Sequence, residues 1–79
     1  MNIVYSTQYC PWCQRAKGVL DKHGITYTEV DVTEDRKLQK EMIERSGRQT
    51  VPQIFFGDEH IGGFDDLVKY FQSNKQDAA

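Results

Sequence analysis

Cysteine is scarce in this sequence, and so are the features that direct a chain to a membrane or to nucleic acid. Only two of the 79 residues are cysteines, whereas a disulfide framework in a small secreted domain needs several. No apolar run approaches the ~18 residues of a membrane span, and the chain does not start with the basic and apolar segments of a signal peptide. The net charge is only −2, and the basic residues form no stripe. We therefore expect a cytoplasmic protein whose partners include neither membranes nor nucleic acid.

Length and composition fit one small globular domain. The chain has no repeats or linkers, and its 38% apolar and 28% charged residues are ordinary for such a domain. A chain of this length buries a comparatively small core. We expect a single domain over residues 1–79. We also expect a monomer, because the pattern leaves no apolar face for a second copy.

The first half of the chain predicts two strand–helix pairs. Residues 3–6 are rich in β-formers, and Pro11 suits the first position of a helix that ends near Gly24. Residues 26–32 predict a second strand. Thr33 is then a candidate N-cap for a helix that Gly47 ends.

The second half predicts a hairpin and a last helix. Residues 51–56 and 60–61 favour strands, and the residues between them favour a turn. An amphipathic helix follows Gly62-Gly63, and the polar tail 73–79 is expected to fray. The order βαβαββα predicts an α/β fold with a four-stranded mixed sheet flanked by three helices.

Cys10 and Cys13 fall where the first strand turns into the first helix. The N–H groups of a helix N-terminus stabilise a thiolate, which lowers a cysteine pKa from ~8.5 into a range of ~3.5–7.5. Cys13 lies one turn further on and suits the resolving role in thiol–disulfide exchange. Since a bridge across so short a loop stabilises a fold only weakly, the pair indicates redox chemistry rather than scaffolding.

Two other interpretations of the cysteine pair stay open at this point. Half of a structural zinc site has the same spacing, and His23 and His60 are the remaining soft ligands, although neither has a paired ligand spacing. The two cysteines could also be inert buried thiols.

Three segments together resemble the signature segments of the glutaredoxins. They are Cys10-Pro11-Trp12-Cys13, Thr50-Val51-Pro52-Gln53-Ile54-Phe55 and Gly62-Gly63-Phe64-Asp65-Asp66-Leu67, in the family's order. The resemblance implies a thioredoxin-like fold and a glutathione-dependent enzyme that reduces protein–glutathione mixed disulfides and protein disulfides. Cys10 would be the nucleophile and Cys13 the resolving thiol. Glutathione would be the co-substrate, disulfide-bearing or glutathionylated proteins the partners, and no tightly bound cofactor or metal is implied.

The resemblance also implies a glutathione site around the cysteines. Val51-Pro52 matches the family's cis-proline segment, whereas the residues alone favour a trans proline at the start of an edge strand. Asp65 is the main candidate for the γ-glutamyl end, although acidic residues in this place also cap helices. Gln49, next to Arg48, would face the glycyl carboxylate. The implied glutathione-binding residues are Tyr9, Trp12, Gln49, Thr50, Val51, Pro52, Gly63, Phe64, Asp65 and Asp66.

One departure from the family pattern concerns Thr7. Many glutaredoxins carry a lysine three residues before the first cysteine, so a less depressed Cys10 pKa or weaker glutathione binding is expected here. Two other functions are compatible with the cysteine pair: a redoxin reduced by thioredoxin reductase, and a carrier of a glutathione-ligated iron–sulfur cluster. The loop before Asp66 argues against the first, and Pro11 argues against the second.

Overall fold

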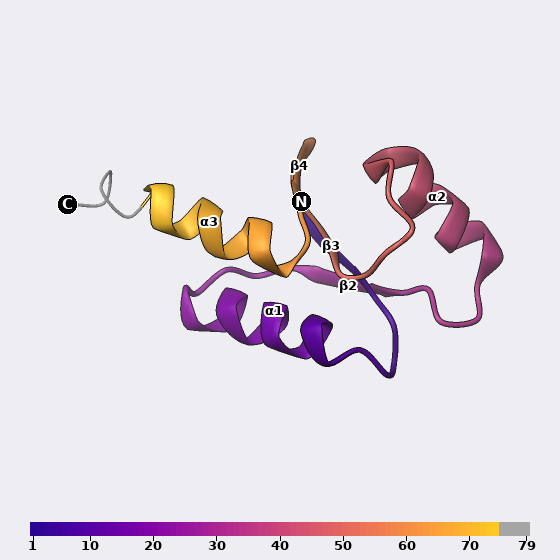
Figure 1. Ribbon diagram of the computed structural model, residues 1–79, viewed down its shortest axis with the longest axis horizontal. Helices are drawn as coiled ribbons and strands as arrows, with labels where there is room; N and C mark the ends of the chain where they lie inside the picture. Colours follow the sequence, from indigo (N-terminus) through magenta and orange to yellow (C-terminus); the bar gives the residue numbers. More distant parts are fainter. Residues whose placement is uncertain (75–79) are drawn as a thin grey trace.

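The structure, a computed structural model, describes residues 1–74 (Figure 1). Strands and helices alternate in the predicted order βαβαββα. The elements are β1 (Asn2–Ser6), α1 (Pro11–Lys22), β2 (Thr28–Asp31), α2 (Arg36–Ser46), β3 (Gln53–Phe56), β4 (Glu59–Gly62) and α3 (Phe64–Asn74). No helix within residues 1–74 is long and apolar enough to cross a membrane.

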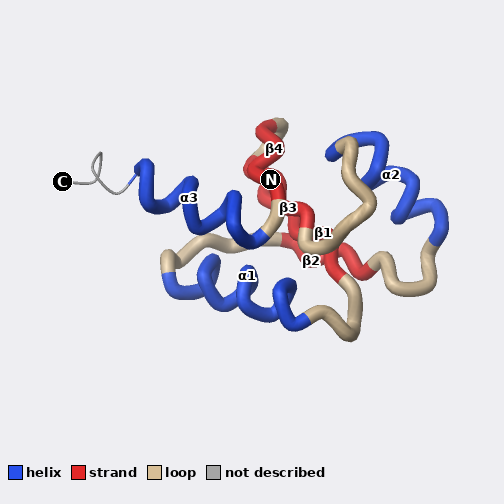
Figure 2. Tube along the Cα trace, viewed as in Figure 1, coloured by secondary structure: helices blue, strands red, loops and turns tan. Residues whose placement is uncertain are grey.

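The four strands form one mixed sheet in the order β2-β1-β3-β4, so β2 and β4 are its edges (Figure 2). β1 and β2 are parallel, as the intervening helix requires, whereas β3 is antiparallel to both β1 and β4. The predicted four-stranded mixed sheet with three helices is therefore confirmed.

The strands bury residues on both faces of the sheet, and each face has its own core. Val4 and Ile54 point to one face, where they pack with Ala16 and Leu20 of α1 and Leu67 of α3. The other face carries a second cluster, which consists of Tyr5, Val32, Met42 and Phe55. Accordingly, α1 and α3 lie together on one side of the sheet and α2 lies on the other (Figure 1).

The hydroxyl of Tyr5 ties α2 to the sheet. The Tyr5 ring is fully buried, and its hydroxyl donates to Glu41 at 2.6 Å and accepts from Arg45 at 2.9 Å. The Arg45 guanidinium also lies over the Phe55 ring at 4.3 Å. Burial, with the Glu41 carboxylate as the second cause, raises the pKa of Tyr5 above its usual value.

The start of α2 differs from the prediction. Its N-cap is Asp35, whose carboxylate accepts from the Leu38 N–H at 3.0 Å, and not Thr33. Thr33 is engaged elsewhere, because its N–H and hydroxyl both donate to Asp31 and its hydroxyl oxygen accepts from the Gln8 N–H at 2.9 Å. The contact from the Thr33 N–H to the Asp31 side chain, two residues before it, forms an Asx turn. Because Thr33 belongs to this turn, it does not cap the helix, which begins only at Arg36.

Other boundaries also differ from the prediction: β1 begins one residue earlier than residue 3, β2 is shorter than residues 26–32, and β4 extends one residue beyond 60–61 at each end. β3 begins at Gln53 rather than at residue 51, because the Val51–Pro52 peptide bond is cis and leaves the ladder. The last helix continues to Asn74, so the expected fraying is wrong for residues 73 and 74, and it lies outside the described residues from 75 onward. The extent of the single domain expected over residues 1–79 stays a prediction.

Candidate functional site

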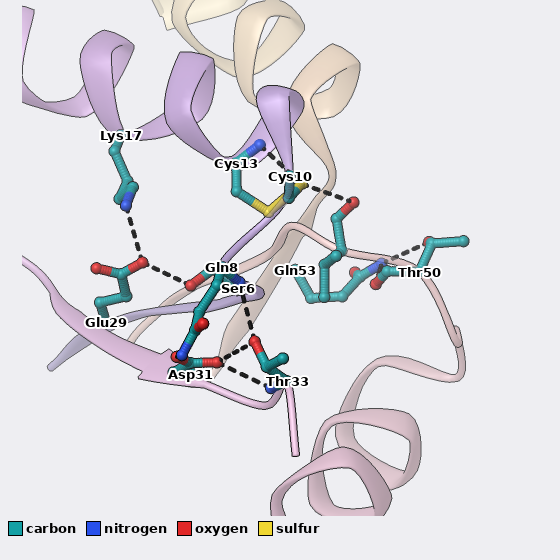
Figure 3. The surroundings of a disulfide bond; sticks show 11 residues. Ser6, Gln8, Cys10, Cys13, Lys17, Glu29, Asp31, Thr33, Thr50 and Gln53 are labelled. Atoms are coloured by element: carbon teal, nitrogen blue, oxygen red, sulfur yellow. Dashed lines mark hydrogen bonds and ion pairs between the residues drawn. A yellow bond between two sulfur atoms is a disulfide. The ribbon is translucent and has the colours of Figure 1, made fainter. Parts of the chain in front are cut away.

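The two cysteines occupy the first turn of α1 and form a disulfide (Figure 3). Their Cα atoms are 5.2 Å apart, within the range that disulfides span. Cys10 is the N-cap residue, and its sulfur accepts from the Cys13 N–H at 3.0 Å. Pro11 follows at the first helical position, where its missing N–H leaves no unsatisfied donor.

The two cysteine residues differ in their exposure to solvent. Cys10 is partly buried, whereas Cys13 is completely buried among the residues of the helix face that packs on the sheet. A reactive thiolate needs both access and a nearby positive field. Cys10 is the more accessible of the two cysteines and lies at the positive end of the helix dipole.

The cis-proline segment lies directly beside Cys10. The Val51 carbonyl oxygen is 3.8 Å from the Cys10 sulfur. While the two cysteines form a disulfide, the Cys10 sulfur has no proton to donate, so the two atoms are only in contact. The predicted cis form of Val51–Pro52 is confirmed. It turns the backbone of Thr50 and Val51 away from the sheet ladder and places it along the rim of the site.

A groove of about 290 Å³ runs from the helix start past this segment to the start of α3. Its walls contain most of the residues predicted to bind glutathione, and Arg48 in addition. The lining residues are Trp12, Arg48, Thr50, Val51, Pro52, Gly63, Phe64, Asp65 and Asp66. Tyr9 and Gln49 lie outside this lining and are exposed, Tyr9 to 88%.

Asp66 closes one end of the groove with two interactions. Its carboxylate accepts from the Gly63 N–H at 3.0 Å, which caps α3, and forms an ion pair with the Arg48 guanidinium at 2.9 Å. The Arg48 hydrogen bond, followed by that of Gly63, holds the pKa of Asp66 below its usual value. Asp66 is therefore the residue that caps α3, whereas Asp65 is exposed and lines the groove.

Gly62 has no space for a side chain. Its φ is +118°, and a Cβ atom built there would lie 2.7 Å from the Asp66 Cγ atom. Gly62 thus leaves the space in which the Asp66 carboxylate folds back over the backbone and reaches the Gly63 N–H. This explains in physical terms why the loop contains glycine in front of an acidic pair.

Aromatic side chains form the outer wall of the groove. The Trp12 ring is half exposed and packs on Phe64 with 5.3 Å between centroids. The Arg15 guanidinium lies 4.6 Å above the Trp12 ring. These contacts fix the orientation of the Trp12 ring, and the ring presents an apolar surface to the groove.

A polar cluster lies on the opposite side of the disulfide, between α1 and β2. Ser6, 1% exposed, donates to the Glu29 carboxylate at 2.6 Å, and the Lys17 ammonium contacts the same oxygen at 2.9 Å (Figure 3). The hydrogen bonds of Ser6, and then of Lys17, lower the pKa of Glu29. Thr7 lines the same hollow, with Lys17 as its neighbouring cation.

The fully buried Gln53 is a site residue that the sequence analysis did not single out. Its side chain links His60 of β4 to Thr50 in the groove wall. The only signal in the sequence was an amide directly after Pro52, at the start of an otherwise apolar strand.

The structure gives no support to a zinc site at the cysteine pair. His23 stacks on Phe71 with 3.9 Å between ring centroids, and His60 bonds to Gln53. In the part of the chain from residue 1 to 74, no three histidine, cysteine or acidic side chains gather as metal ligands would.

Comparisons with known proteins agree with this geometry. The family model described as Glutaredoxin matches residues 2–61. Glutaredoxin 3 of Escherichia coli strain K12 is 47% identical over 64 residues, which cover 81% of this chain and 77% of that protein. The buckwheat glutaredoxin–glutathione complex superposes with a TM-score of 0.83 at 30% identity, covering 94% of this chain and 70% of that one. Glutaredoxin from Brucella melitensis gives 0.81 at 44% identity, covering 98% and 84%. The chain, with its redox-active cysteine pair on a thioredoxin-like fold, belongs to the glutaredoxin family.

Proposed function

We propose that this protein is a glutathione-dependent thiol–disulfide oxidoreductase acting on protein–glutathione mixed disulfides and on protein disulfides. One observation carries the proposal: the sulfur of Cys10 lies between a helix N-terminus and the open groove at Val51, while Cys13 is buried behind it. A membrane or nucleic acid has no part in this reaction. The protein would work in the cytoplasm as a monomer.

The reaction begins at Cys10 once the disulfide has been reduced. The Cys10 thiolate attacks the glutathione sulfur of a mixed disulfide, the substrate S–S bond breaks, and the protein thiolate leaves and takes up a proton. Cys10 then carries the glutathionyl group. The thiolate of a second glutathione attacks that group, which releases oxidised glutathione and restores the Cys10 thiolate.

With a protein disulfide, Cys13 completes the exchange. Cys10 forms a mixed disulfide with the substrate, and the Cys13 thiolate attacks the Cys10 sulfur and expels the substrate thiolate. The Cys10–Cys13 disulfide remains, and two glutathione molecules reduce it. Since Cys13 is only one helical turn from Cys10, this attack requires no rearrangement of the fold.

The charges around the groove suit a zwitterionic tripeptide. The backbone of Thr50 and Val51, which lies outside the sheet ladder, offers its N–H and C=O groups to the central part of glutathione. The N–H groups at the start of α3 favour a carboxylate, and Asp65 offers an exposed carboxylate for the ammonium group. Arg48 lines the groove whereas Gln49 lies outside its lining, so Arg48 is the better candidate to meet a carboxylate of the tripeptide.

The proposal is tested by the reduction of a small glutathione mixed disulfide, coupled to glutathione reductase. We expect activity to disappear in Cys10→Ser and to survive in Cys13→Ser, because only Cys10 carries the glutathionyl group. An inactive native protein would contradict the glutathione assignment. In that case thioredoxin reductase is the alternative reductant to test.

An iron–sulfur carrier is the second alternative, and it has its own test. The solved structures similar to this chain include one titled as the holo form of glutaredoxin C1 from poplar, 37% identical with a TM-score of 0.82. Purification without oxygen and in the presence of glutathione would give a coloured dimer if this chain carried a cluster. We expect a colourless monomer, because Pro11 stiffens the backbone beside Cys10.

A further inference from the structure

The Gln53 side chain sits completely inside the protein with both ends of its amide bonded. Its NH₂ group donates to the Thr50 carbonyl oxygen at 3.0 Å and lies 3.2 Å from the Thr50 hydroxyl. Its oxygen is 2.8 Å from the His60 Nε2 atom. A buried amide group with one end unpaired destabilises a fold because it has lost its hydrogen bonds to water, so the loss of one partner of Gln53 should change the position of the others.

The direction of each hydrogen bond follows from the partners. A backbone carbonyl can only accept, so the NH₂ end of Gln53 must face Thr50 and the oxygen must face His60. His60 therefore donates from Nε2–H, whether the imidazole is neutral or charged. The chain of donors runs in one direction, from His60 through Gln53 to Thr50 (Figure 3 shows the Gln53–Thr50 step).

This series of hydrogen bonds ends at the backbone segment that lies beside Cys10. The ladder between β1 and β3 begins with the pair Tyr5 and Gln53, so strand pairing does not hold Thr50 and Val51. The Gln53 amide holds the Thr50 carbonyl instead, one residue before the Val51 carbonyl that lies 3.8 Å from the Cys10 sulfur. Both residues line the groove.

We infer that Gln53 and His60 are positioning residues, which hold the Thr50–Val51 backbone in the conformation that binds the tripeptide part of a glutathionylated substrate. The inference rests on the function proposed above. His60 is itself held by the Phe55 ring at 4.9 Å, and it borders a hollow of its own with Tyr70. The imidazole acts only through Gln53, because it is not part of the groove lining.

The test compares variants of the histidine in steady-state assays with a glutathionylated peptide. His60→Leu removes the donor to Gln53, and His60→Gln restores an N–H donor at that place. We expect the KM of His60→Leu to rise about tenfold with kcat within about twofold of native, since the loss concerns binding more than chemistry. His60→Gln should recover most of the loss. The control is His23→Leu, which removes the other histidine far from the groove.

A KM for His60→Leu equal to the native value would overturn the inference. Equal losses in His60→Leu and His60→Gln would overturn it as well, because the hydrogen bond would then not be the cause. If His60→Leu does not fold, Gln53→Glu takes its place, since it keeps the acceptor for His60 but sets an oxygen against the Thr50 carbonyl.

A spectroscopic measurement separates this inference from the proposed function. In the free protein, His60→Leu should shift the backbone amide signals of Thr50 and Val51, and His60→Gln should return them towards native positions. If the native protein has no glutathione-dependent activity, the proposed function fails, and the inference about substrate binding fails with it. If the native protein is active but these amide signals do not move, the positioning role alone is refuted.

Discussion

The loop that begins α3 allows a sharp test, because the same substitution at three glycines should have three different outcomes. Gly62→Ala places a Cβ atom against the Asp66 carboxylate at a residue whose φ is +118°. Backbone strain of this kind costs about 1–3 kcal/mol. Displacing Asp66 from the Gly63 N–H removes a helix cap worth about 1 kcal/mol. We expect a total loss of about 2–4 kcal/mol.

The two control glycines separate strain from steric conflict. Gly47 also has a positive φ, +72°, but no atom lies within 4 Å of a Cβ built there, so Gly47→Ala should cost only about 1 kcal/mol. Gly18 lies inside α1, also with open space around a Cβ. Gly18→Ala should stabilise the protein by about 0.5–1 kcal/mol.

Thermal unfolding followed by circular dichroism would rank these variants. In a domain of this size each kcal/mol corresponds to about 4–8 °C in Tm. The Tm should therefore fall by roughly 8–32 °C in Gly62→Ala, fall by about 4–8 °C in Gly47→Ala, and rise in Gly18→Ala. The reasoning is refuted if Gly62→Ala loses no more than Gly47→Ala, because the contact with Asp66 would then have no energetic consequence.

Three further predictions concern single side chains. Tyr5→Phe removes a hydroxyl with two partners on α2 and should lower the free energy of unfolding by about 1–2 kcal/mol in urea titrations; no change would mean that the hydroxyl is equally well hydrated when the chain is unfolded. Because its hydrogen bond with Arg48 lowers the pKa of Asp66, this carboxylate stabilises the fold above its ordinary pKa, and the contribution disappears as the pH falls through the lower folded value. The stability difference between native protein and Asp66→Asn should accordingly be constant near neutral pH and shrink below about pH 4, and a difference that grows on acidification would contradict this assignment. Thr7→Lys should lower the Cys10 pKa, measured by thiolate absorbance in the Cys13→Ser background, since it adds a cation three residues before the nucleophile; a Cys10 pKa equal to that of the Cys13→Ser protein with Thr7 in place would refute this expectation.

The order of elements could be predicted because local signals and the tertiary structure agree. Pro11 begins α1 and Gly47 caps the end of α2, both as predicted. Each of these helix ends depends on the backbone preference of that one residue. The N-cap of α2 could not be predicted in this way. Thr33 and Asp35 are both good caps, and the choice depends on Asp31 and Gln8, whose contacts with Thr33 exist only in the folded chain.

In the candidate site too, some features could be predicted from the sequence and others could not. The motif residues around Cys10 could be located from their order in the chain, because the family resemblance fixes the three segments. Which side chain performs which task could not, since both acidic residues of the pair at Asp65 and Asp66 suit a cap. Only the path of the chain reveals that Arg48 reaches Asp66 across the groove and that Gln53 connects His60 to Thr50.

The two edge strands have a consequence for how copies of the protein meet. Each is only four residues long, and β2 presents exposed Glu29 and Asp31 while β4 begins with exposed Glu59. If a second molecule added its own β2 to this edge, carboxylates of like charge would become neighbours, which disfavours the pairing. Hydrogen bonds lower the pKa of both Glu29 and Asp31, so these side chains keep their negative charge into mildly acidic solution. Pairing between the β2 edges of two molecules is thus disfavoured at neutral and mildly acidic pH, and it should become easier in strong acid.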